Sequence, residues 1–127
     1  MPCRTPSRPL VLIVEDDGVT RLDAVVIIRA AGYDVMEAST ADEAITLLES
    51  SLPIAIIFTD IEMPGSIDGQ HLAHAVRKRW PPVHIVATSG HSDLRSFGAL
   101  PEGVRFLPKP YVHAAVTRIL EEVLNAA

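Results

Sequence analysis

The chain has one cysteine and no long apolar run, and each of these features limits the kinds of protein to which it can belong. Cys3 is the only cysteine among 127 residues, so no internal disulfide can form, which fits a reducing compartment. No apolar run approaches the roughly 20 residues that a membrane-spanning helix needs. Residues 1–9 are polar and rich in proline, without the apolar segment of a secretory signal. We therefore expect a cytoplasmic protein with no membrane partner, in which residues 1–9 form a flexible tail before one domain over residues 10–127.

Glycine-rich phosphate-binding motifs and an excess of positive charge are also missing. Neither Gly-x-x-x-x-Gly-Lys-Ser/Thr nor Gly-x-Gly-x-x-Gly occurs, so a nucleotide-binding module is disfavoured. The formal net charge is -5, and an acidic surface repels the phosphate backbone of nucleic acids. We expect no direct nucleic-acid binding and a protein as the partner.

What the sequence does contain is a regular alternation of short apolar runs with segments of helical character. Runs that are apolar throughout are typical of strands buried on both faces of a sheet. Strands are expected over Leu10–Val14, Tyr33–Glu37, Ile54–Thr59, Val83–Thr88 and Val104–Leu107. Helices are expected over Val19–Ala31, Thr40–Ser50, Asp68–Trp80 and Val112–Ala126, with a short one over Ser92–Ala99. The alternation predicts an α/β fold, a parallel sheet with helices on both faces. For a doubly wound five-stranded sheet, we expect the order 2-1-3-4-5.

The first expected helix has an acidic start and an apolar stripe. Asp17 stands where the helix begins, so it is expected to suit the helix dipole rather than to belong to a site. Leu22, Val25 and Val26 are spaced by three and four residues, and this stripe is expected to face the core.

Acidic residues follow two of the buried strands. Glu15 and Asp16 come directly after the first strand, and Asp60 and Glu62 follow the third. In the order 2-1-3-4-5 the winding direction reverses between these two strands, and ligands bind at that point outside the carboxyl ends. Carboxylates gathered there repel one another, and a hard divalent cation relieves the repulsion. Oxygen ligands without histidine or cysteine favour Mg²⁺.

The other two strand ends carry groups of complementary chemistry. Thr88 and Ser89 close the fourth strand, and Lys109 and Pro110 follow the fifth. A hydroxyl and an ammonium group beside a carboxylate–metal cluster suit a transferred phosphoryl group, whose peripheral oxygens are charged. A carboxylate can itself be the nucleophile, which gives an acyl phosphate. Together the four strand ends indicate a phosphoryl-accepting site.

With these segments in order, the chain resembles the receiver domains of two-component response regulators from Leu10 to Leu124. The matching stretches are Val11–Asp17, Thr59–Pro64, Asp68–Gly69, Ala87–Ser89 and Phe106–Pro110. The resemblance implies a flavodoxin-like fold that takes a phosphoryl group from the phosphohistidine of a histidine kinase or a phosphotransfer protein, with Mg²⁺ as cofactor. It also implies that the domain is a phosphoacceptor, which assists its own phosphorylation and dephosphorylation, and not an enzyme.

The family pattern implies a role for each strand-end acid. Asp60 would accept the phosphoryl group and also contact the metal. Asp16 would be a metal ligand, and Glu15 would hold the metal directly or through water. Glu62 would contribute its backbone carbonyl as a further ligand.

The same pattern implies roles at the fourth and fifth strands. Thr88 and Lys109 would bind phosphoryl oxygens, and Ser89, being small, would leave the approach to the acceptor open. Thr88 would move toward the new phosphoryl oxygens, and Phe106 would turn inward as the second part of the switch. The peptide bond that precedes Pro110 would be cis.

Four features depart from the common family pattern. Glu15 stands where aspartate is more frequent, and the loop over residues 65–67 is one residue longer than the common form. Phe106 occupies an aromatic position where tyrosine is also common, and the fourth expected helix is weak. These departures concern the output mechanism rather than the phosphoryl chemistry, so the downstream protein is left open.

Two other functions fit parts of the pattern. An aspartyl phosphatase of the haloacid dehalogenase type uses similar groups, but its nucleophile follows the first strand in an Asp-x-Asp arrangement, whereas Asp60 follows the third. A non-phosphorylated scaffold with the same fold would not need Mg²⁺. As a receiver, the domain fits three contexts: a stand-alone regulator, a phosphate sink in a relay, or a segment of a hybrid kinase.

Overall fold

The computed structural model describes residues 8–61, 69–90 and 101–125. The strands are β1 (Leu10–Val14), β2 (Asp34–Ala38), β3 (Ile54–Asp60), β4 (His84–Ser89) and β5 (Arg105–Pro108). The helices are α1 (Gly18–Ala30), α2 (Ala41–Glu49), α3 (Gly69–Arg79) and α4 (His113–Asn125). These nine elements lie within one residue of the expected bounds at each end; the short helix expected over Ser92–Ala99 falls outside the described residues. None of the described helices is both long and apolar enough to cross a membrane.

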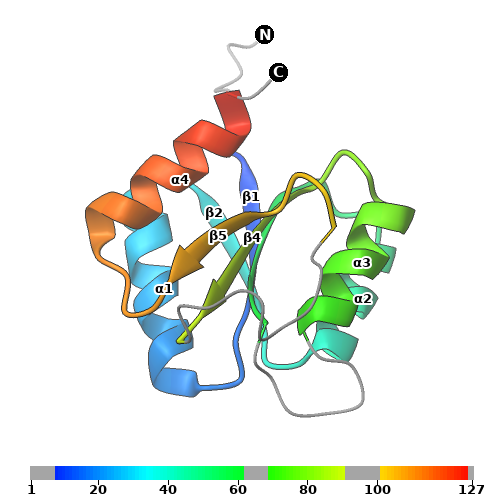
Figure 1. Ribbon diagram of the computed structural model, residues 1–127, viewed down its shortest axis with the longest axis horizontal. Coiled ribbons are helices and arrows are strands. Elements are labelled where there is room, and N and C mark those ends of the chain that lie inside the picture. The colour runs from blue at the N-terminus through cyan, green and yellow to red at the C-terminus, as the bar shows by residue number, and fades with distance from the viewer. Residues whose placement is uncertain (1–7, 62–68, 91–100, 126–127) are drawn as a thin grey trace, which may run out of the picture.

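The five strands form one parallel sheet in the order β2-β1-β3-β4-β5, which confirms the predicted topology. Figure 1 shows α1 and α4 on one face of this sheet and α2 and α3 on the other. The carboxyl ends of parallel strands meet at one edge of a sheet. The point where the winding reverses lies between β1 and β3, and a ligand site is expected there.

Alternate residues of β1 point into two separate cores. Val11 and Ile13 belong to the core beneath α1 and α4, and Leu12 and Val14 belong to the core beneath α2 and α3. Because β1 is covered on both faces, it has no polar side, and its sequence is apolar throughout. Each such side chain contributes roughly 1.5–3 kcal/mol by leaving water. This burial holds β1 in register and so fixes where the polar residues after it emerge.

The face of α1 that packs on the sheet differs from the predicted one. Val25 is buried as expected, but Leu22 and Val26 are 62% and 55% exposed. The buried face consists of Ala24, Val25, Ile27 and Ile28. The helix is apolar on two sides, so a spacing of three and four residues fits either of them. Val19, Leu22 and Val26 form an exposed apolar strip, which we name the α1 stripe.

Asp17 is the N-cap of α1. Its carboxylate accepts hydrogen bonds from the backbone N–H of Thr20 at 2.8 Å and from the Thr20 hydroxyl at 2.6 Å. The hydroxyl and the N–H of Thr20 lower the pKa of the Asp17 carboxyl. The prediction that Asp17 serves the start of the helix is confirmed.

Thr40 caps the N-terminus of α2. Its hydroxyl oxygen accepts a hydrogen bond from the backbone N–H of Glu43 at 3.1 Å, and the Glu43 carboxylate accepts one from the N–H of Ser39 at 2.6 Å. These bonds satisfy N–H groups that have no partner within the helix.

Thr40→Ala is expected to lower the free energy of unfolding by about 1 kcal/mol, because an N–H group at the start of α2 loses its acceptor. Urea denaturation followed by circular dichroism measures the change. Thr40→Ser keeps the hydroxyl oxygen and is the matched control. Equal losses in the two variants would contradict the capping role.

Candidate functional site

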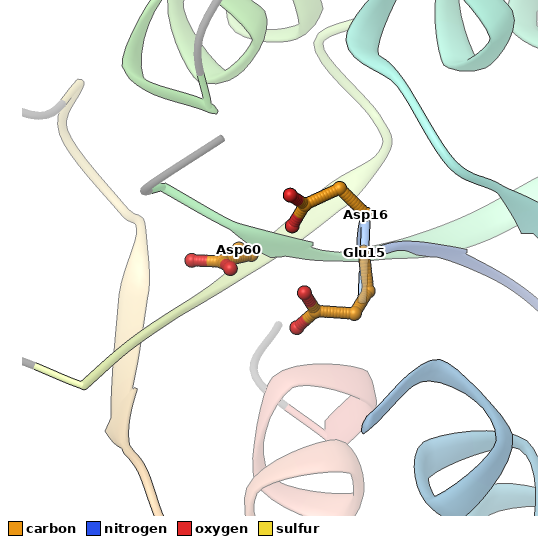
Figure 2. Close-up of side chains that lie close together, drawn as sticks. All are labelled: Glu15, Asp16 and Asp60. Carbon is orange, nitrogen blue, oxygen red and sulfur yellow. The ribbon is translucent and has the colours of Figure 1, made fainter. Parts of the chain in front are cut away.

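Three carboxyl groups meet where the winding of the sheet reverses. Asp60 is the last residue of β3, and Glu15 and Asp16 directly follow β1. One carboxylate oxygen from each residue lies within 4.8 Å of those of the other two. Figure 2 shows the carboxyl groups of Glu15 and Asp16 leaving the chain on opposite sides and turning toward the side on which Asp60 lies. Asp60 and Glu15 are only 5% and 4% exposed, whereas Asp16 faces solvent.

Lys109 joins this acid cluster from the end of β5. Its ammonium nitrogen lies 2.6 Å from Glu15 Oε1 and 3.0 Å from Asp60 Oδ2. Burial works against the charge of Lys109, but the hydrogen bonds to both carboxylates outweigh it and raise the pKa of Lys109. Burial also raises the pKa of the Glu15 carboxyl, although Lys109 acts in the other direction. The two buried carboxylates of Glu15 and Asp60 thus share the one ammonium group of Lys109.

Arg21, near the start of α1, supports the end of β1 and is not among the residues that the strand-end pattern predicts. Its Nη1 donates to the backbone carbonyl of Glu15 at 2.9 Å, and its Nε pairs with Glu37 Oε1 of β2 at 3.2 Å. The only signal in the sequence is a basic residue six positions after Glu15, which is too common to single out. Arg21 fixes the backbone from which the Glu15 side chain starts.

Two of the residues predicted to bind or admit a phosphoryl group, Thr88 and Ser89, lie at the end of β4. Thr88 pairs in register with Asp60 and is 1% exposed. Its hydroxyl makes a long contact of 3.5 Å with the backbone carbonyl of Thr59. Ser89 is fully buried, and its carbonyl accepts a hydrogen bond from the backbone N–H of Lys109 at 2.7 Å. This bond fixes the end of β5 against β4 and places Lys109 near the acids.

The remaining predicted residues occupy separate positions. Phe106 lies on β5 in register with Ala87 of β4 and is half-buried. The peptide bond between Lys109 and Pro110 is cis. Glu62, which is expected to offer its backbone carbonyl to a metal, lies outside the described residues.

A pocket of about 500 Å³ opens beside the acid cluster. Its lining comes from Val19, Thr20 and Asp23 of α1 and from Gly90, Lys109, Pro110 and Tyr111 at the strand ends. The ring of Tyr111 meets that of Phe58 edge-on, with 5.6 Å between centroids. Burial raises the pKa of Tyr111 to about 12, so its phenol is neutral near pH 7. Because Val19 belongs both to the pocket and to the α1 stripe, the two features are continuous.

The donor set of the acid cluster fits a hard divalent cation. The candidate ligands Glu15, Asp16 and Asp60 offer carboxylate oxygens, which favour Mg²⁺. With Lys109 charged, three carboxylates and one ammonium leave two uncompensated negative charges, which a divalent cation would balance. Ligand oxygens on opposite sides of Mg²⁺ lie about 4.2 Å apart. Separations of up to 4.8 Å therefore admit the ion after a small shift of the side chains, or with water as a bridge.

Comparison with known proteins gives a consistent result. The family model described as "Response regulator receiver domain" matches residues 11–121. Over 118 residues the chain is 31% identical to the sensor kinase CckA of Brucella abortus. The alignment covers 91% of this chain and 12% of CckA. Over 121 residues it is 28% identical to the DNA-binding transcriptional regulator NtrC of Salmonella typhimurium. This alignment covers 94% of this chain and 25% of NtrC.

A solved structure, the response regulator receiver protein from Sinorhizobium medicae, has a TM-score of 0.84 at 30% identity and covers 94% of this chain and 96% of that one. The flavodoxin-like sheet and the family match define a receiver domain of the two-component type. The chain belongs to the response regulator receiver family, as its sequence motifs indicate. It spans 12% of CckA and 25% of NtrC, so the similarity concerns only that share of either protein.

Proposed function

We propose that Asp60 accepts a phosphoryl group from a histidine kinase or a phosphotransfer protein, with Mg²⁺ bound at the acid cluster. The observation that carries this proposal is the setting of Asp60. It is a buried carboxylate at the end of β3, with Glu15 and Asp16 beside it and the Lys109 ammonium at 3.0 Å. A nucleophile, a cation site and a fixed positive charge in one place are what transfer to a carboxylate requires.

The proposed step exchanges one bond to phosphorus for another. An oxygen of Asp60 attacks the phosphorus of a phosphohistidine in line with the P–N bond. The new P–O bond forms while the P–N bond breaks, and the electron pair of that bond stays on the ring nitrogen. A proton on the other ring nitrogen makes the departing group a neutral imidazole. The product is an acyl phosphate.

Charge neutralisation is the main contribution of the protein to this step. Bound Mg²⁺ would supply positive charge to the phosphoryl oxygens from the side of Glu15 and Asp16. Lys109 supplies a second positive charge from the side of β5, at the 3.0 Å distance it already holds from Asp60. Fixed charges of this kind, inside a site withdrawn from water, act more strongly than the same charges in solvent.

The proposed switch consists of Thr88 and Phe106. Within the described residues the Thr88 hydroxyl has only a long contact with the carbonyl of Thr59. Turning toward a phosphoryl group on Asp60 would cost little of that contact. Phe106 is half-buried on the neighbouring strand. Movement of Thr88 would leave space beside β4 that Phe106 fills, and this would alter the surface that the downstream protein contacts.

The exposed α1 stripe supports a protein as the phosphoryl donor. Val19, Leu22 and Val26 are each more than half exposed and lie together on one side of α1. Large apolar side chains gathered on a surface mark contact sites for other proteins. The stripe runs into the pocket beside Lys109, so a partner seated on it would bring a phosphohistidine near Asp60. The similarity to a sensor kinase supports the same class of partner.

Labelling by a small phosphodonor tests the proposed function. Incubation with radiolabelled acetyl phosphate and Mg²⁺ is expected to place one hydroxylamine-sensitive phosphoryl group on each chain. Turnover of many phosphomonoester molecules per chain would instead favour a phosphatase. A chain that neither binds Mg²⁺ nor takes up label would favour a scaffold.

Removal of Mg²⁺ with EDTA is expected to abolish this labelling, because the acid cluster then keeps two uncompensated negative charges that repel the donor. Addition of excess Mg²⁺ should restore it, which separates loss of the cation from damage to the protein. The measurement is the radioactivity retained on the chain after gel electrophoresis. Labelling at full rate in EDTA would contradict the cation's role.

A further inference from the structure

Both carboxylate oxygens of Glu15 have partners within the protein. Oε1 accepts a hydrogen bond from the Lys109 ammonium at 2.6 Å, and Oε2 accepts one from the backbone N–H of Asp17 at 3.2 Å. The side chain is only 6% exposed, and Arg21 holds its backbone carbonyl at 2.9 Å. Glu15 is therefore fixed at its backbone and at both ends of its carboxylate.

The Lys109 ammonium lies closer to Glu15 than to Asp60, at 2.6 Å against 3.0 Å. Charge-assisted hydrogen bonds of this length are strong. The ammonium is thus held among the same oxygens that would receive a cation. Two positive groups at such short range repel each other, and the repulsion is large in a buried site because water screens it poorly.

We propose that Glu15 is a positioning residue for Lys109. It holds the ammonium beside Asp60 before any phosphoryl group arrives, and a cation entering the acid cluster has to compete with Lys109 for Glu15. Glutamate suits this role because its carboxylate reaches Lys109 while Oε2 keeps its bond to the Asp17 N–H. The inference rests on the proposed function only in taking the acid cluster as the cation site.

A double-mutant cycle on cation binding tests the competition. The dissociation constant for Mg²⁺ is measured by isothermal titration calorimetry for the wild-type chain, Glu15→Gln, Lys109→Met and the double variant. With Glu15 present, Lys109→Met is expected to tighten binding roughly tenfold, because the competitor for Glu15 is gone. In the Glu15→Gln background the same change is expected to tighten binding only about threefold. Equal factors in the two backgrounds would overturn the proposal.

A second measurement addresses position directly in the metal-free protein. Carbon relaxation of the Lys109 side chain, measured by NMR, reports how well its end is ordered. Glu15→Gln is expected to lower that order. Asp34→Asn removes the same unit of charge at the start of β2, at the opposite end of the sheet, and should leave it unchanged. Cation binding in the variants without Glu15 could be too weak to measure. In that case the order of the Lys109 side chain tests the proposal, and unchanged order in Glu15→Gln would overturn it.

These measurements involve no phosphoryl group, so they separate the inference from the proposed function. Lys109→Met could change Mg²⁺ affinity by the same factor with and without Glu15 while the wild-type chain labels normally. That result would exclude the positioning role of Glu15 and leave Asp60 as the phosphoacceptor. Different factors in the two backgrounds, with no labelling of the wild-type chain, would support the positioning role of Glu15 and exclude the phosphoacceptor role of Asp60.

Discussion

Asp60→Asn is expected to abolish labelling of the chain by a small phosphodonor in the presence of Mg²⁺. The amide that replaces the carboxylate has no negative charge and is a poor nucleophile, so no acyl phosphate forms. The change is nearly isosteric, and the Lys109 ammonium keeps its contact with Glu15 at 2.6 Å. The fold should therefore persist while the chemistry is lost. The measurement is the hydroxylamine-sensitive radioactivity on the chain, compared with its circular dichroism spectrum.

The matched control for this variant is Asp34→Asn, which makes the same chemical change on an exposed residue at the other end of the sheet. It should label like the wild-type chain. Undiminished labelling of Asp60→Asn would exclude Asp60 as the acceptor. Labelling lost equally in the two variants would point to a general effect of charge and would exclude the specific role.

The central strands of the sheet were accessible from the sequence because β1 and β3 are buried on both faces. A strand with no solvent face must be apolar throughout, so Leu10–Val14 and Ile54–Asp60 stand out as runs that stop at acids. The position of the acids follows, since parallel strands end at one edge and the winding reverses between these two. The grouping of Glu15, Asp16 and Asp60 was therefore predictable.

The packing face of α1 was not predictable in the same way. Leu22 and Val26 are as apolar as Val25 and Ile28, and all four lie on a helix whose periodicity admits two faces. Only the docking of α1 against the sheet and α4 decides which side is covered. The prediction that Leu22 and Val26 belong to the core was wrong for that reason.

Contacts between side chains that are distant in the chain were also not predictable from the sequence. Glu15 and Lys109 are separated by 94 positions, and the pattern shows only that both follow strands. Which oxygen receives the ammonium depends on the brace from Arg21 and on the bond from the Asp17 N–H. The contact from Arg21 exists only once α1 has formed beside the end of β1.

Lys109→Met is expected to slow phosphorylation of Asp60 by about 10²-fold at saturating Mg²⁺, because the transferred phosphoryl oxygens lose a fixed positive charge within a buried site. The same variant is expected to bind Mg²⁺ more tightly, since Lys109 no longer competes for Glu15. The two effects have opposite directions, and this separates the role of Lys109 in transfer from its role in cation binding. The measurements are the single-turnover rate of labelling and the Mg²⁺ dissociation constant.

Lys109→Arg is the matched control, because it keeps the positive charge while changing the shape of the group. Its labelling rate should fall between those of the wild-type chain and Lys109→Met. Methionine roughly preserves the length and apolar character of the lysine stem, so a slow rate in that variant reports loss of the ammonium group rather than a cavity. A labelling rate in Lys109→Met equal to that of the wild-type chain would show that the ammonium, although 3.0 Å from Asp60, takes no part in the transfer.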